Sequence, residues 1–93
     1  MILYHGTDYG SALQILRDGF AGSSFTPKYD EARAWARFKA VDEHLGGAVL
    51  KVSLPRKGLT YSQEEFEYYY ADDRTVPGHL FKIVERIPCW GGD

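Results

Sequence analysis

The first residues that could do chemistry are His5, Gly6 and Thr7, which follow the short apolar run Ile2–Tyr4. The run predicts a buried strand, and a glycine directly after the histidine lets the backbone approach a ligand closely. The ring of His5 could then donate a hydrogen bond to a ligand hydroxyl, while the main chain of Gly6 could pair with a carboxamide. The alternative is a histidine at a strand end whose ring is hydrogen-bonded within the core.

A second candidate is the acidic segment around Glu65 and Glu67. Residues 59–73 include five acidic side chains and no basic one. The aromatic run 66–70 predicts a strand, and side chains two residues apart share one face of a strand, so Glu65 and Glu67 would point the same way. Carboxylates at a strand start could stabilise a developing cation or orient a nucleophile. The alternative is a solvated edge strand that its charge keeps soluble.

Trp35 is the third candidate. A helix is predicted over 28–43, and the spacing places Trp35 on its inner side with Ala32, Ala36 and Phe38. A tryptophan at such a position is most simply a core residue. A ring that faced a cleft could instead stack on a flat ligand.

Several other chemistries lack support in the sequence. His5, His44 and His79 are widely spaced and form no His-x-x-x-His pair, so we expect no metal. The one cysteine, Cys89, excludes an intramolecular disulfide and suits a reducing compartment. The sequence contains no glycine-rich nucleotide fingerprint and no P-loop.

The elements that must position these candidates form an α+β pattern, with two helices early and the strands late. We expect Gly6 to Asp8 to break the first strand. A helix then begins at Asp8 or Ser11, either of which can cap it, and ends at Gly19. Thr26 is the expected cap of the second helix, with Pro27 at its first position. The remaining expectations are a short strand at 23–26, strands at 48–54, 66–70 and 80–87, a loop at 56–63, turns at 72–74 and 77–78, and a loose tail at 88–93.

The composition describes one folded domain spanning 1–93. A chain of 93 residues with 44% hydrophobic and 15% aromatic residues has enough apolar surface for one core. The net charge of −2 argues against a module that binds nucleic acid through its phosphates. We therefore expect no direct nucleic-acid contact. No signal peptide and no membrane segment are expected, which favours a cytoplasmic protein.

In their order along the chain, these segments resemble ADP-ribosyltransferase domains, the fold shared by poly(ADP-ribose) polymerases, diphtheria-type toxins and RNA 2′-phosphotransferases. Leu3-Tyr4-His5-Gly6-Thr7 and a helix that ends in Gly19-Phe20 resemble the opening motif. The second motif is matched by Ser24-Phe25-Thr26-Pro27 followed by Trp35. The third is matched by the strand that starts at Glu65–Glu67 and is closed by Pro77-Gly78-His79-Leu80.

The resemblance implies a compact split β-sheet that binds NAD+ as co-substrate, without a metal. The implied NAD+-binding residues are His5, Gly6, Thr7, Phe25 and Trp35. His5 would hold the adenosine-side ribose, Gly6 the nicotinamide amide, and Trp35 would stack on the nicotinamide. The implied catalytic residues are His5, Ser24, Glu65 and Glu67. Glu65 completes a Gln-x-Glu form and Glu67 a Glu-x-Glu pair, and the sequence leaves open which one is the key carboxylate.

The implied activity is a mono-ADP-ribosyltransferase, a toxin or effector that transfers ADP-ribose from NAD+ to a side chain of a protein partner and releases nicotinamide. A second hypothesis is an inactive binding protein on the same scaffold, such as a small acidic inhibitor of phage type. A third, RNA 2′-phosphotransferase chemistry, is disfavoured because the sequence has no basic cluster to contact RNA phosphates.

Overall fold

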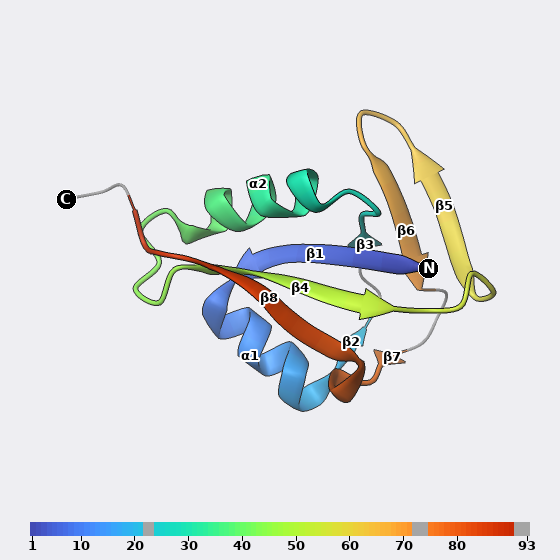
Figure 1. Cartoon of the computed structure of the whole chain (residues 1–93), viewed down its shortest axis with the longest axis horizontal. Helices are drawn as coiled ribbons and strands as arrows, with labels where there is room; N and C mark the ends of the chain where they lie inside the picture. The colour runs from blue at the N-terminus through green and yellow to red at the C-terminus, as the bar shows by residue number, and fades with distance from the viewer. Residues whose placement is uncertain (22–23, 72–74, 91–93) are drawn as a thin grey trace.

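A computed structural model describes residues 1–21, 24–71 and 75–90. The domain is α+β, with two α-helices and short antiparallel sheets (Figure 1). In chain order, the elements are β1 (Ile2–Asp8), α1 (Tyr9–Asp18), β2 (Phe20–Ala21), β3 (Ser24–Phe25), α2 (Tyr29–Ala40), β4 (Gly47–Ser53), β5 (Leu59–Gln63), β6 (Glu67–Ala71), β7 (Thr75–Val76), the 3₁₀ turn η1 (Gly78–Leu80) and β8 (Phe81–Ile87).

The sheet β1-β4-β8 lies between the two helices, with α2 on one face and α1 on the other (Figure 1). Its central strand, β4, is buried on both faces, because alternate side chains point to opposite sides. Leu50 and Val52 pack in the core that includes Ala12 and Ile15 of α1. Val49 points the other way, into the core formed by α2. This strand therefore belongs to both cores of the molecule.

Small residues let α2 lie directly on the sheet. Ala32, Ala36 and Ala40, each four residues apart, form its fully buried stripe. Two of the strand positions under this stripe are glycines. A Cβ on Gly6 would lie 1.8 Å from the carbonyl oxygen of Ala32, and one on Gly47 would lie 2.4 Å from that of Ala36. The glycines are therefore required by the close approach of helix and sheet.

The remaining strands form two smaller sheets, β3-β6-β5 and β2-β7. One isolated bridge joins the first of these to the main sheet: the N–H of Tyr4 donates to the carbonyl of Thr26 over 2.8 Å, and the N–H of Thr26 donates back over 2.9 Å. The β5–β6 hairpin projects beyond the N-terminal end of β1 (Figure 1). The described strands are thus divided among three sheets, and the α+β class expected from the sequence is confirmed.

Several sequence expectations need correction. Gly6 to Asp8 does not break the first strand, because pairing with β4 continues to Asp8. The segment expected as a loop at 56–63 contains the strand β5, which alternates poorly in hydrophobicity because it is an exposed edge strand. The helices are not all early, since η1 follows β7. The turn expected at 72–74 lies outside the described residues, as do Ser23 and the last residues of the expected tail, 91–93.

The second helix is shorter than expected. It begins at Tyr29 with Lys28 as N-cap, because the hydroxyl of Thr26 accepts the N–H of Lys28 over 3.1 Å before the helix has started. It ends at Ala40, where Val41 becomes extended and pairs with Trp90. The indole Nε1 of Trp90 also donates to the carbonyl of Arg37 over 2.8 Å, so the expected loose tail is held in place as far as this residue.

The first helix agrees with the sequence. Asp8 is its N-cap and accepts the N–H of Ser11 over 3.0 Å, and Gly19 ends it with a φ of 86°. Neither of the two described helices is long and apolar enough to cross a membrane.

Candidate functional site

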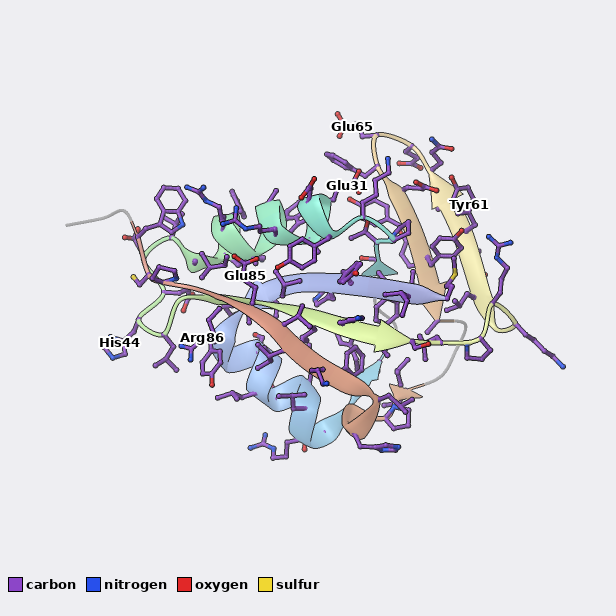
Figure 2. All side chains as sticks on the ribbon, in the orientation of Figure 1. Glu31, His44, Tyr61, Glu65, Glu85 and Arg86 are labelled. Carbon is purple, nitrogen blue, oxygen red and sulfur yellow. The ribbon has the colours of Figure 1, made fainter. Side chains whose placement is uncertain are left out.

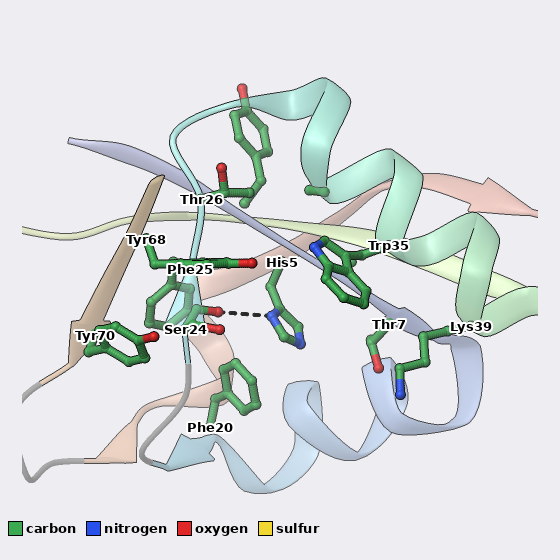
Figure 3. A pocket seen from close by; sticks show the side chains of 13 residues that line it. His5, Thr7, Phe20, Ser24, Phe25, Thr26, Trp35, Lys39, Tyr68 and Tyr70 are labelled. Carbon is green, nitrogen blue, oxygen red and sulfur yellow. Dashed lines mark hydrogen bonds between the residues drawn. The ribbon is translucent and has the colours of Figure 1, made fainter. Parts of the chain in front are cut away.

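A cleft opens where β1 and β3 separate beyond the bridge between Tyr4 and Thr26. Its volume is about 640 Å³, within the usual range of small-molecule sites, which is roughly 300–1,000 Å³. β1, β3, α2 and β6 all contribute side chains to its wall (Figure 3). The cleft therefore brings together segments that are far apart in the sequence.

His5 lies in the cleft with a fixed orientation. Its Nδ1 is 3.0 Å from the main-chain oxygen of Ser24 (Figure 3). Since a carbonyl oxygen can only accept, Nδ1 carries the proton, and Nε2 of the neutral ring is an acceptor. The ring packs against Phe20, with centroids 4.4 Å apart. His5 is thus a histidine satisfied by a core hydrogen bond that still offers one nitrogen to a ligand, and this nitrogen accepts rather than donates.

Burial lowers the pKa of His5 below its usual value of 6.5, because the charged ring would lose its hydration. The hydrogen bond to Ser24 opposes this effect, and the positive charge of Lys39 adds to it. The ring is therefore neutral at pH 7, with Nε2 available as an acceptor.

The main chain of Gly6 is a second polar element of the cleft. Both main-chain groups of Tyr4 point away from β4, toward Thr26. Because main-chain groups of alternate residues in a strand point to the same edge, those of Gly6 point there too, beyond the bridge. Gly6 lines the cleft at this edge. One N–H donor and one C=O acceptor, side by side, are the complement of a carboxamide.

Aromatic rings form two sides of the cleft. Trp35 lies on one side of His5, and Tyr68 and Tyr70 of β6 lie on the other (Figure 3). Trp35 is 41% exposed. The expectation that Trp35 and Phe38 lie on the inner side of α2 is therefore wrong, since the alanines occupy that side. Trp35 takes instead the position of a ring in a cleft, where a flat ligand can stack on it.

The other predicted binding residues also lie at the cleft. Ser24 lines it, although its described contact to His5 uses the main-chain carbonyl. Phe25 is 1% exposed and belongs to the cleft's floor, where its ring packs on Phe20. Thr7 is buried, and its hydroxyl donates to Asp8 over 3.3 Å.

The two predicted carboxylates lie elsewhere. Glu65 is in the exposed turn of the β5–β6 hairpin, outside the strand in which it was expected (Figure 2). Glu67 begins β6, where its carboxylate accepts the hydroxyl of Tyr61 over 3.2 Å and lies 3.7 Å from the amine of Lys28. Alternation along β6 places Glu67 on the face opposite Tyr68. Among the residues that the structure describes, no aspartate or glutamate lines the cleft.

The lining residues that were missed in the sequence include Tyr68, Tyr70 and Lys39. Tyr68 and Tyr70 are two residues apart and therefore share one face of β6. Lys39 and Trp35 are four residues apart and therefore share one side of α2. These signals existed, but the sequence does not say which face of either element meets the cleft.

Comparison with known proteins does not assign the chain to a family. No protein-family model matches the chain, and no curated protein is significantly similar to it in sequence. Within the described residues, no group of three His, Cys, Asp or Glu side chains is placed to hold a metal ion.

Proposed function

We propose that this chain binds NAD+ in the cleft and is a mono-ADP-ribosyltransferase. The observation that carries the proposal is the convergence of Gly6, Trp35 and His5 on one cleft. The main-chain pair of Gly6 complements the carboxamide of nicotinamide, the indole of Trp35 offers a stacking surface for its ring, and Nε2 of His5 accepts from a ribose hydroxyl.

In the proposed reaction, the bond between the ribose C1′ and the nicotinamide nitrogen breaks, and nicotinamide leaves as a neutral molecule. A nucleophilic side chain of the protein acceptor forms the new bond to C1′ and loses its proton to water. The ribose passes through a cation-like state, which a nearby carboxylate would stabilise. We assign this role to Glu65 or Glu67, which lie on the β5–β6 hairpin and not in the wall of the cleft.

A second candidate is binding without transfer, and one observation favours it. Tyr68 and Tyr70 line the cleft, whereas no carboxylate of the described residues does. A hydroxyl can orient a ribose but supplies no negative charge. On this alternative, the chain would hold NAD+ or a related ligand as part of an inhibitory interaction.

Binding is tested by the fluorescence of Trp35 during a titration with NAD+. The Trp90→Phe variant leaves Trp35 as the only tryptophan, and we expect saturable quenching. In calorimetry, Trp35→Ala should weaken binding about tenfold or more, the usual contribution of a stacked aromatic ring. Trp90→Ala is the matched control, because Trp90 has nearly the same exposed fraction, 44%, and does not line the cleft. No binding of NAD+ by the unaltered protein would rule the proposal out.

Transfer is tested separately, with labelled NAD+ and a cell lysate as the source of acceptors. The transferase predicts labelled protein, and at least a hundredfold slower labelling by the double variant Glu65→Gln, Glu67→Gln. Saturable binding of NAD+ with no labelled protein would support the binding protein instead.

A further inference from the structure

Lys39 gives the cleft its charge. It is the only acidic or basic side chain that lines the cleft in the described part of the chain, apart from the neutral ring of His5. A site with one cation and no carboxylate in its wall attracts an anionic ligand group.

The charge of Lys39 is also uncommitted, unlike that of the two arginines on the same helix. Arg33 pairs with Glu85 over 3.0 Å, and the guanidinium of Arg37 lies 5.3 Å from the ring centroid of Trp90. Within the described residues, the side-chain amine of Lys39 forms neither a hydrogen bond nor an ion pair. Its amine is therefore free to bind a ligand without breaking an existing contact.

The position of Lys39 relative to Trp35 fits the shape of a nucleotide. The two residues are four apart in α2, so they share one side of the helix, with a rise of about 6 Å between them. Figure 3 shows Lys39 beside Thr7, at the end of the cleft farthest from Tyr70. A ligand whose ring stacks on Trp35 can therefore reach Lys39 with a charged group about one helical turn away.

We propose that Lys39 binds the diphosphate of the ligand and makes the cleft select dinucleotides and nucleoside diphosphates over nucleosides. This inference rests on the proposed function, since it names the part of NAD+ that the lysine recognises. It also assigns different residues of the cleft to different parts of the ligand, with the carboxamide at the main chain of Gly6 and the diphosphate at the amine of Lys39.

The test compares ligands with and without the diphosphate by calorimetry. NAD+ and nicotinamide riboside share the nicotinamide and its ribose, but nicotinamide riboside has no phosphate. We expect Lys39→Ala to weaken NAD+ binding about tenfold or more and to leave nicotinamide riboside binding unchanged. Lys39→Arg should retain most of the affinity, and Lys57→Ala, an exposed lysine outside the cleft, is the matched control. Added salt should weaken NAD+ binding more in the unaltered protein than in Lys39→Ala.

Equal losses for both ligands, or no loss for NAD+, would overturn the role of Lys39 while leaving the proposed function standing. A titration with ADP tests the opposite case, in which the diphosphate site exists but the proposed function is wrong. If the unaltered protein binds ADP but not NAD+, and Lys39→Ala abolishes the binding of ADP, the proposed function fails and the diphosphate site is retained. Absence of binding for both NAD+ and ADP would overturn both. Circular dichroism of each variant confirms that it is folded.

Discussion

His5 connects the core of the molecule to its cleft. One ring nitrogen is fixed by the main chain of Ser24, and the ring is held among phenylalanines by Phe20 and Phe25. This anchoring has a chemical consequence, because it decides which nitrogen meets a ligand and in which protonation state. The two interpretations that the sequence left open for His5, core hydrogen bond and ligand contact, are compatible in this geometry.

The lowered pKa of His5 predicts how binding depends on pH. The affinity for NAD+ should be constant from pH 8 to about 6.5 and should fall at lower pH, where protonation of Nε2 removes the acceptor. Fluorescence titrations of the Trp90→Phe variant between pH 5 and 8 measure this. An affinity that rises as the pH falls would show that the His5 ring binds the ligand as a cation. This result would contradict binding by a neutral ring with its proton on Nδ1. The variant Lys57→Ala should reproduce the unaltered profile.

At the scale of elements, the close packing of α2 on the sheet decides which residues fit between them. The helix backbone lies so close to β1 that Gly6 has no space for a side chain. The proposed ligand role of Gly6 and this packing role coincide in one residue. A substitution of Gly6 that abolishes binding would therefore be no evidence of ligand contact by itself.

We predict that Gly6→Ala lowers the free energy of unfolding by about 3 kcal/mol, since the methyl group would push against the carbonyl of Ala32. Urea denaturation measures the effect. Gly10→Ala is the matched control, because a Cβ there meets only a carboxylate oxygen of Asp8, at 3.5 Å. That variant should be unchanged or about 0.5 kcal/mol more stable, as the unfolded chain loses freedom. Equal effects of the two substitutions would contradict the packing argument.

Glu85 ties α2 to the edge strand β8. It accepts the hydroxyl of Tyr29 and pairs with Arg33, and the hydrogen bond from Tyr29 lowers its pKa below the usual 4.5, with a further contribution from Arg33. A group whose pKa is lowered by folding stabilises the protein above its unfolded pKa, and this stabilisation is lost as the pH falls through the folded pKa.

Glu85→Gln should therefore lower the free energy of unfolding by about 1 kcal/mol at pH 7, a typical value for a partly exposed ion pair with an added hydrogen bond. The difference from the unaltered protein should vanish in acid, at pH values below the lowered pKa. Thermal unfolding between pH 3 and 7 tests both statements. Glu43→Gln, on an exposed residue after α2, is the matched control. A difference that persisted in acid would assign the effect to packing rather than charge.

At the scale of the whole molecule, the acidic residues of the β5–β6 hairpin lie apart from the wall of the cleft. The exposed Glu65 lies on the hairpin turn and Glu67 is engaged beside Lys28 and Tyr61, while the described wall of the cleft has only a positive charge. The net charge of −2 therefore does not describe the site. A dinucleotide with a negative diphosphate would meet the opposite charge there.

Much of the local structure could be predicted from residue type and spacing. The cap at Asp8, the stop at Gly19 and the strand 48–54 follow from hydrogen-bonding chemistry and alternation within a few residues. The predictions failed where tertiary contacts override local signals. β1 continues through Gly6 because β4 pairs with it, and Trp35 leaves the inner side of α2 because only alanines fit against the glycines of the sheet.

The sequence by itself determined the α+β class, because the class depends on local patterns and their succession. The family resemblance of the sequence implied His5, Ser24, Phe25 and Trp35 as candidates for one site. Only the tertiary structure decided that β1 and β3 part to form a cleft, that Tyr68, Tyr70 and Lys39 line it, and that Glu65 and Glu67 do not. The physical reason is that periodicity tells which side chains share a face of an element. Only packing between elements decides where that face points.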